Sequence, residues 1–237
     1  EAIVKRLARE GARACVVVDI DDGNIARVVK DLRQASPVLA VGKRCDVASE
    51  GEVAALLDQV EAEGGPISLF VCSAGIGPSL EGAVGVDVPP SEWSRMMGVN
   101  FQQTASVARH LIPLYIERGA GHLMVTASAA GLLTQIGSVT YAVSKAAAVS
   151  ISEWLSVTYG DLGGGVSCLC PQAVSTPMTA SSPDSVASVD GMLEPEDVAE
   201  ATVEGLRSGS FLILPHPKVA EYALRKATDR DRWILGM

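Results

Sequence analysis

Two side chains that could exchange a proton with a substrate fall on one expected helix. Tyr141 and Lys145 belong to the segment YAVSK, and helical geometry places residues i and i+4 side by side. An ammonium group beside a phenol favours the phenolate, so we expect the pKa of Tyr141 to fall below its usual value of about 10. Such a tyrosine could act as an acid or a base close to neutral pH.

A serine precedes this helix at the end of an expected strand. Ser128 closes the segment HLMVTAS, and a hydroxyl at a strand end can form a hydrogen bond with a substrate oxygen. The Tyr-x-x-x-Lys spacing alone is weak evidence, because Tyr222 and Lys226 repeat it in YALRK. That second pair lies in a charged helix and has Gly209 in the place of Ser128. We therefore interpret the second pair as structural.

Strand-like and helix-like apolar periodicities alternate along the whole chain. Strands are predicted at 14–20, 38–42, 67–75, 122–128, 166–170 and 211–215. Helices are predicted at 2–10, 23–35, 50–63, 91–118, 139–160, 195–207 and 216–233. This alternation predicts one α/β domain over residues 1–237, a three-layer αβα, Rossmann-like fold with a doubly wound, mostly parallel sheet. Ligands bind such sheets at the carboxyl ends of the strands, so we expect the Ser-rich segment 175–194 to form a substrate lid.

The bulk composition narrows the class of protein. A net charge of −9 on 237 residues argues against a nucleic-acid partner and against an anionic membrane surface. The five cysteines, an odd number, fall in or beside strand-like runs, which indicates reduced thiols in a cytoplasmic protein. No apolar run is long enough for a membrane span, and we expect no signal peptide. The scattered residues His110, His122 and His216 predict no metal site.

Several further segments resemble the short-chain dehydrogenase/reductase superfamily, in that family's order. VTASAAG followed by YAVSK is similar to its serine strand and its Tyr-x-x-x-Lys helix. MGVNF, which contains Asn100, resembles the helix that supplies a fourth catalytic residue. CDV at 45–47 is similar to the family's Asp-Val pair, and PQAVSTPM at 171–178 to its Pro-Gly-x-x-x-Thr segment.

The resemblance implies a division of roles among four catalytic residues. Tyr141 would be the general acid/base, and Lys145 would hold the nicotinamide ribose and lower the pKa of Tyr141. Ser128 would orient the substrate oxygen. Asn100 would hold a water molecule that links Lys145 to solvent. The cofactor itself would supply the hydride.

The same resemblance implies the cofactor-binding residues, which are Asp46, Val47, Ser73, Ala74, Gly75, Tyr141, Lys145, Pro171, Val174 and Thr176. Asp19 ends the second strand of the family pattern, where a carboxylate binds the adenosine ribose and repels a 2′-phosphate. Ile20, Asp21 and Asp22 follow it, with no basic residue among them. We therefore expect NAD, with NADP less favoured. Asp19 could also be a solvated strand-end acid, and Asp46 a turn or capping residue.

The sequence departs from the family pattern in three places. The family's Gly-rich phosphate loop is not found, and the chain opens inside what resembles the first helix. We expect the sequence to be a fragment that lacks this loop and a first strand, and a sheet without that strand would lose a central member. The family's Asn-Asn-Ala-Gly is Cys72-Ser73-Ala74-Gly75, and its Pro-Gly is Pro171-Gln172. These two changes affect the cofactor pocket but remove no catalytic group.

The leading hypothesis is an NAD-dependent dehydrogenase or reductase that acts on a secondary alcohol or ketone. Its pocket would come from 78–90, 129–138 and 175–194, which contain no Arg or Lys and favour an apolar, uncharged molecule. By resemblance we expect a homodimer or homotetramer, paired through the long helices at 91–118 and 139–160. The alternatives are a non-catalytic dinucleotide-binding sensor or scaffold and a nucleoside-cofactor methyltransferase. Neither of them requires the tyrosine–lysine pair.

Overall fold

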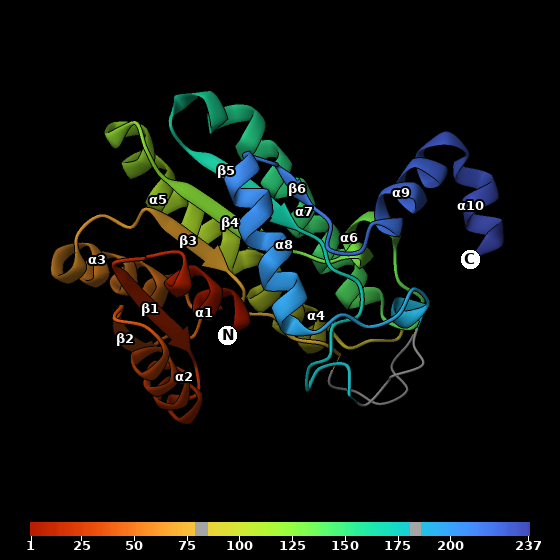
Figure 1. Ribbon diagram of the computed structural model, residues 1–237. Coiled ribbons are helices and arrows are strands. Elements are labelled where there is room, and N and C mark those ends of the chain that lie inside the picture. Colours follow the sequence, from red (N-terminus) through yellow and green to blue (C-terminus); the bar gives the residue numbers. More distant parts are fainter. Residues whose placement is uncertain (79–84, 181–185) are drawn as a thin grey trace.

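Parallel strands form the centre of the fold, and the helices lie on both of their faces (Figure 1). A computed structural model describes residues 1–78, 85–180 and 186–237. The strands are β1 (Ala14–Asp19), β2 (Leu39–Arg44), β3 (Leu69–Cys72), β4 (His122–Thr126), β5 (Gly165–Leu169) and β6 (Leu212–Ile213). They pair as β1–β2 and as β3–β4–β5–β6, and every pair is parallel. The prediction of a parallel α/β sheet is confirmed.

The helices form two layers around these strands. One layer contains α1 (Ala2–Arg9), α2 (Asp22–Ala35) and α8 (Pro195–Ser208), and α1 packs against α8. The other contains α3 (Glu50–Gly64), α5 (Gln103–Arg118) and α7 (Val139–Tyr159). The largest apolar cluster joins α3, α5 and α7 to β3, β4 and β5. The strands and the two helix layers thus form three layers, and apolar side chains are buried on both faces of the strands.

The predicted helix at 91–118 is interrupted. It consists of α4 (Pro90–Met97), a π-helical turn at Gly98–Gln102, and α5. Pro113 lies inside α5 without ending it. A π turn inserts one residue into the helical spacing and occurs often at functional sites. Here it contains Asn100, one of the residues expected to take part in catalysis.

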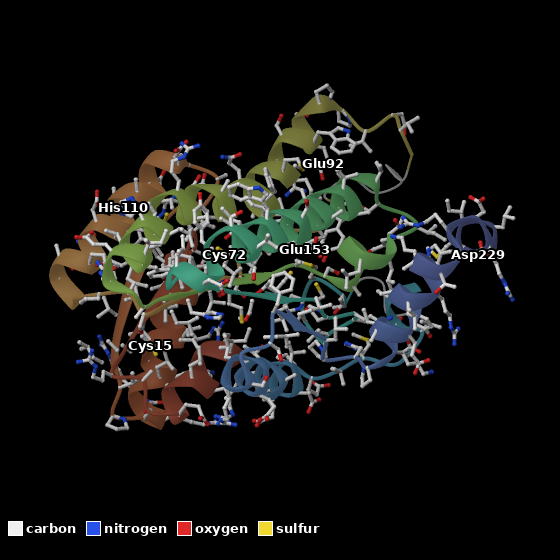
Figure 2. All side chains as sticks on the ribbon, turned by 90° about the horizontal axis from the view of Figure 1, so that it is seen from above. Cys15, Cys72, Glu92, His110, Glu153 and Asp229 are labelled. Carbon is white, nitrogen blue, oxygen red and sulfur yellow. The ribbon has the colours of Figure 1, made fainter. Side chains whose placement is uncertain are left out.

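The C-terminal region contains two helices, so the prediction of a single helix at 216–233 is wrong. They are α9 (Lys218–Thr228) and α10 (Arg230–Gly236). Asp229, labelled in Figure 2, adopts an extended conformation between them, and its side chain accepts a hydrogen bond from the Arg232 N–H at 2.9 Å. An aspartate that caps the next helix in this way ends the previous one.

The short α6 (Ala129–Leu133) was not predicted, and 3₁₀ turns cover Gly160–Leu162 and Val186–Ser188.

The two groups of strands are separate sheets in the described part of the chain, where no hydrogen-bond ladder joins β1 to β3. The expected strand pattern is present, but its sheet is divided at that point.

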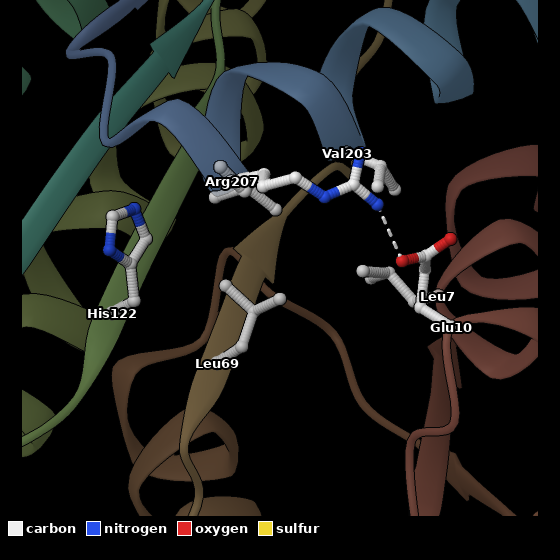
Figure 3. Close-up of a pocket in the computed structure, with 7 residues that line it drawn as sticks. Leu7, Glu10, Leu69, His122, Val203 and Arg207 are labelled. Carbon is white, nitrogen blue, oxygen red and sulfur yellow. Dashed lines mark hydrogen bonds and ion pairs between the residues drawn. The ribbon is translucent and has the colours of Figure 1, made fainter.

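A cavity of about 380 Å³ lies between α1, α8 and the first residues of β3 and β4 (Figure 3). Glu10 and Arg207 form an ion pair of 2.7 Å at its edge. This cavity lies at the amino ends of the strands, opposite the edge where ligands are expected.

Two properties of the side chains bear on the class of protein. All five cysteines are buried free thiols. Among the described residues, no helix is both long and apolar enough to cross a membrane.

Candidate active site

Tyr141 and Lys145 lie in the first two turns of α7, beside the carboxyl ends of β4 and β5. Ser138 caps this helix, and its hydroxyl accepts a hydrogen bond from the Tyr141 N–H at 3.4 Å. The helix then runs along β5 as part of the main core. The cap fixes where the helix begins. It therefore places the first two turns beside the carboxyl ends of β4 and β5.

Lys145 is a buried cation at the centre of this region. Its residue is 5% exposed, and Nζ donates a hydrogen bond to the Thr126 carbonyl oxygen at 2.9 Å. Nζ also lies 5.8 Å from the centroid of the Tyr141 ring. Burial disfavours the charged form and lowers the pKa of Lys145 to about 8. The side chain is therefore mostly an ammonium at neutral pH and loses its proton just above it.

The expectation that the pKa of Tyr141 is lowered is wrong for the protein in this state. Burial raises the pKa of the phenol above its ordinary value, and a hydrogen bond with Ser128 opposes that rise only in part. Removing a phenolate from water is unfavourable, and this desolvation is the largest influence on the pKa of Tyr141. Tyr141 is consequently a phenol that holds its proton, with the Ser128 hydroxyl as its neighbour.

Ser128 connects three segments. Its Oγ accepts a hydrogen bond from the Ala130 N–H at 3.1 Å and so caps α6, and it donates to the Pro171 carbonyl oxygen at 3.4 Å. The Ala129 N–H donates to that same carbonyl at 2.9 Å. The end of β4 and the segment after β5 are thereby held together at the hydroxyl that faces Tyr141.

Asn100 occupies the π turn and is 2% exposed. Its amide makes a pair of hydrogen bonds with Ile76, from N–H to Oδ1 at 2.9 Å and from Nδ2 to the carbonyl at 3.0 Å. Nδ2 also contacts the Ser144 Oγ of α7 at 3.1 Å. Asn100 thus fixes the chain after β3 against α7. A Cβ at Gly75 would lie 3.5 Å from both Asn100 Oδ1 and Lys145 Nζ.

Gln103 is a site residue that the sequence analysis missed. Its side chain is buried, and Nε2 donates a hydrogen bond of 2.6 Å to the Ala74 carbonyl oxygen. It also binds the Val99 carbonyl within the π turn. Ser73 and Ala74 are exposed at the end of β3, so this bond orients the peptide there. The one available signal was a glutamine one helical turn after Asn100.

Asp19 is the last residue of β1, and its carboxylate accepts a hydrogen bond from the Asp21 N–H at 3.0 Å. Its partner in the strand register is Arg44, the exposed last residue of β2. The residues that directly follow Asp19 in the sequence include no basic group. The parallel pairing places one beside it.

Asp46 behaves as the turn residue that was its alternative interpretation. Its Oδ1 accepts a hydrogen bond from the Ala48 N–H at 3.0 Å, and its own N–H donates to Glu52 Oε2 at 2.9 Å. These bonds shape the turn between β2 and α3. Val47 lies in that turn and is half-buried. Both residues lie at the carboxyl end of a strand.

The described part of the segment 171–194 folds back on itself after β5. Val174 forms a parallel bridge with Leu193, and the Thr176 carbonyl accepts hydrogen bonds from the N–H groups of Thr179 and Ala180. Met178 lies close to Gly77, since its Cγ would be 3.7 Å from a Cβ placed there. The segment therefore reaches the chain that Asn100 fixes. Residues 79–84 and 181–185 of the expected pocket lie outside the described residues.

The residues present fit the ribose and nicotinamide parts of a dinucleotide. The Asp19 carboxylate lies at the end of β1, and a turn of small residues follows β3. The Lys145 ammonium lies beside that turn, 3.5 Å from the point that a Cβ of Gly75 would occupy. All of these groups are at the carboxyl ends of parallel strands, where such sheets bind nucleotides.

Comparisons with known proteins agree with this arrangement. A family model described as short chain dehydrogenase matches residues 1–187. The chain belongs to the short-chain dehydrogenase family. Its relatives are dehydrogenases and reductases, so the chain is an oxidoreductase of that family. One relative is cis-4-hydroxycyclohexanecarboxylate dehydrogenase of Sinomonas cyclohexanicum, which is 29% identical over 209 residues, or 84% of this chain and 82% of the relative.

Two solved structures extend the comparison. A short-chain dehydrogenase/reductase from Burkholderia phymatum, in complex with NAD, has a TM-score of 0.85 and 28% identity, covering 97% of this chain and 89% of that one. A short-chain dehydrogenase from Sphingobium yanoikuyae, in complex with NADPH, has a TM-score of 0.82 and 21% identity, covering 99% and 89%. The second likeness concerns the fold alone.

Gly131 tests how closely α6 must approach α7 in this short-chain dehydrogenase. A Cβ there would lie 2.5 Å from the Lys145 carbonyl oxygen, which cannot move without the helix. We expect Gly131→Ala to displace α6 together with the Ser128 cap, lowering kcat at least tenfold and the free energy of unfolding by about 1–3 kcal/mol. Gly64→Ala is the control, because nothing lies within 4 Å of its Cβ. Equal behaviour of the two variants would contradict the packing argument.

The buried ammonium predicts a pH dependence of stability. Folding lowers the pKa of Lys145 from 10.5 to about 8, so the unfolded chain binds more protons between those values and stability rises with pH there. The wild type should gain about 3 kcal/mol relative to Lys145→Met between pH 7 and pH 10.5. Denaturant unfolding of both proteins at each pH measures this difference. A difference that stays constant would show that the ammonium is not buried.

Proposed function

We propose that the protein is an NAD(H)-dependent oxidoreductase that transfers a hydride between nicotinamide and a secondary alcohol or ketone. The observation that carries the proposal is the grouping of Ser128 and Tyr141 beside the buried Lys145 ammonium at the carboxyl ends of parallel strands. Bound nicotinamide would supply or accept the hydride. The chain itself has to place a carbonyl oxygen and move one proton.

Each polar group then has a defined task. The Ser128 and Tyr141 hydroxyls hydrogen-bond the substrate oxygen, and Tyr141 passes its proton to that oxygen or takes it back. Lys145 stabilises negative charge on the phenol oxygen and holds the nicotinamide ribose. Asn100 fixes the β3 turn and α7 in a common frame, which positions Lys145. Its tight contacts with Ile76 and Ser144 support a positioning task beside the expected proton relay.

The protonation state favours one reaction direction at neutral pH. A phenol whose pKa is raised by burial gives up its proton only to a stronger base, such as the alkoxide oxygen that develops when a ketone accepts hydride. Oxidation of an alcohol requires the phenolate instead, which a higher pH supplies. We infer that ketone reduction predominates near neutral pH.

NAD(H) is proposed over NADP(H) because a carboxylate at the end of β1 can accept hydrogen bonds from the adenosine ribose hydroxyls and repels a phosphate. Arg44 limits that preference, since its register position beside Asp19 offers a guanidinium to a 2′-phosphate. The relative solved with NAD supports the first choice. We therefore propose a preference for NADH that depends on Asp19 and is moderated by Arg44.

We propose a small, largely apolar alcohol or ketone as the substrate. The relative from Sinomonas acts, by its name, on a hydroxycyclohexane that carries a carboxylate, so a cyclic skeleton is a reasonable first probe. Arg95 adds a cation beside the expected pocket, although it lies outside the three segments predicted to line it. Its Nη2 donates to the Gly77 carbonyl at 2.8 Å, and Glu92 pairs with it, so most of its charge is already neutralised.

We also propose a cytoplasmic homodimer or homotetramer that pairs through α5 and α7. Val143, Trp154 and Val157 are exposed and share one stripe of α7. An apolar stripe of this kind on a long helix favours burial against a second copy. The five free thiols agree with a reducing compartment.

Tyr141→Phe tests the central role in this proposal. The variant keeps the ring and removes the only proton that the mechanism moves, so we expect kcat for NADH-dependent reduction of a cyclic ketone to fall at least 10³-fold. The dissociation constant of NADH should change less than threefold. Tyr159→Phe is the matched control, because Tyr159 lies at the opposite end of the same helix. Retention of wild-type turnover by Tyr141→Phe would remove Tyr141 from the acid/base role.

Fluorescence titration with NADH and NADPH tests the cofactor preference. The wild type should bind NADH at least about tenfold more tightly than NADPH. Asp19→Asn should reduce this ratio of dissociation constants, because it removes the charge that repels the 2′-phosphate. Arg44→Gln should weaken NADPH binding further and leave NADH binding unchanged. Lys30→Gln, an exposed change on α2, controls for net charge. A cofactor ratio that neither Asp19→Asn nor Arg44→Gln alters would contradict the assignment.

A further inference from the structure

The second Tyr-x-x-x-Lys pair, interpreted above as structural, makes two specific contacts from α9. The Tyr222 hydroxyl donates a hydrogen bond to Asp190 Oδ1 at 3.0 Å. The Lys226 Nζ donates to the Leu132 carbonyl oxygen at 2.6 Å. The first contact reaches the segment that follows β5, and the second reaches α6. One helix therefore joins two segments that are far apart in the sequence.

Asp190 is the charged centre of the first contact. Its side chain is only 7% exposed, and it pairs with Lys218 Nζ at 3.1 Å as well as with Tyr222. Gln172 Nε2 donates to its other oxygen at 3.2 Å. Three donors from two elements converge on one shielded carboxylate, and hydrogen bonds to an ionised acceptor are the stronger kind. The network fixes Asp190 to α9 and to the chain that leaves β5.

The second contact lies next to the catalytic serine. α6 begins at Ala129, directly after Ser128, and Leu132 lies in its last turn. Val219 of α9 is fully buried against Ala129 and Leu133. The Lys226 hydrogen bond thus adds a polar contact to an apolar one. A shift of α9 would be transmitted to α6 and to the hydroxyl that caps it.

Gln172 links the network to the other side of the site. It follows Pro171, whose carbonyl accepts the Ser128 hydrogen bond. The next residue, Ala173, is bonded through its N–H to Ala187 and through its carbonyl to Leu193. Residues 186–193 are therefore held against the end of β5 by backbone bonds and against α9 by Asp190. The side chain that replaces the expected glycine points to Asp190.

We propose that Asp190, Tyr222 and Lys226 are positioning residues that form a clamp and set the size of substrate the site accepts. The clamp holds residues 186–193 at a fixed spacing from α6, the helix that begins directly after Ser128. A fixed spacing admits a substrate that fits it and discriminates against larger ones. The proposal concerns substrate size and thus rests on the redox function proposed above, whereas the clamp itself is a property of the folded chain.

The first test compares kinetic constants for cyclic ketones of increasing ring and substituent size, with NADH in excess. Asp190→Asn keeps the shape of the side chain and removes its charge. Tyr222→Phe removes one hydroxyl and keeps the ring near Trp233, 6.4 Å away between centroids. Lys226→Met removes the second contact. Glu221→Gln is the control on α9, because Glu221 is 64% exposed and faces Arg225.

We expect the three clamp variants to shift kcat/KM toward larger ketones by about tenfold relative to the smallest one, mainly through KM. The control should keep the wild-type ratio within twofold. Asp190→Asn combined with Tyr222→Phe should shift the size ratio little more than the larger single change does, because both weaken the same contact. An unchanged size ratio in all three clamp variants, or a uniform loss across the series, would overturn the proposal.

The second test does not depend on catalysis. Hydrogen–deuterium exchange of peptides covering 129–134 and 186–193 should be at least tenfold faster in Asp190→Asn and Lys226→Met, each mainly in the segment that it releases. Peptides from α3 should exchange as in the wild type. If no ketone is reduced by the wild type, the proposed function fails while this experiment still decides the clamp. Wild-type exchange in both variants would show that the clamp holds nothing.

Discussion

The burial of one ammonium group shapes the candidate site. Lys145 lies under the ends of β4 and β5 with Nζ bonded to a backbone carbonyl, and its residue is almost fully shielded from water. Removing a cation from water is unfavourable, which is why the pKa of this lysine falls to about 8. An apolar residue in its place would make the fold more stable. The presence of a buried lysine is therefore best explained by a chemical role.

A close approach of the backbone packs α6 against the helix that carries this lysine. Gly131 lets α6 lie directly against the Lys145 carbonyl, where a Cβ would come within 2.5 Å of the oxygen. The π turn then directs Asn100 to the chain after β3, so the turn, α7 and the strand ends share one frame. Each contact involves a different segment. The site therefore forms only when most of the fold has formed.

Much of this architecture could be predicted from the sequence. Alternating apolar periodicities located most helices and strands, because long amphipathic elements carry a strong periodic signal. The serine, the tyrosine and the lysine of the site are brought together as predicted. α6 was missed because five residues are too few for a helical period, and the break at Asp229 was missed because charged residues continue on both sides of it.

Other features depend on contacts that a linear pattern does not contain. The raised pKa of Tyr141 follows from burial, which no spacing reports. Arg44 is beside Asp19 only because of the register of two parallel strands. Gln172 could be noted as a departure, but its contact with Asp190 could not. For the same reason Tyr222 and Lys226 could be distinguished from Tyr141 and Lys145 without any prediction of what they bind.

The most direct test of this account is the ionisation of Lys145 itself. The protein labelled with ¹³C-lysine can be titrated by NMR through the side-chain Cε signals, with Lys145→Met used to assign the signal of Lys145. The account predicts a titration midpoint near pH 8, well below that of the exposed lysines. A midpoint at the ordinary value of about 10.5 would mean that the ammonium is solvated. The buried cation on which the proposed acid/base site depends would then not exist.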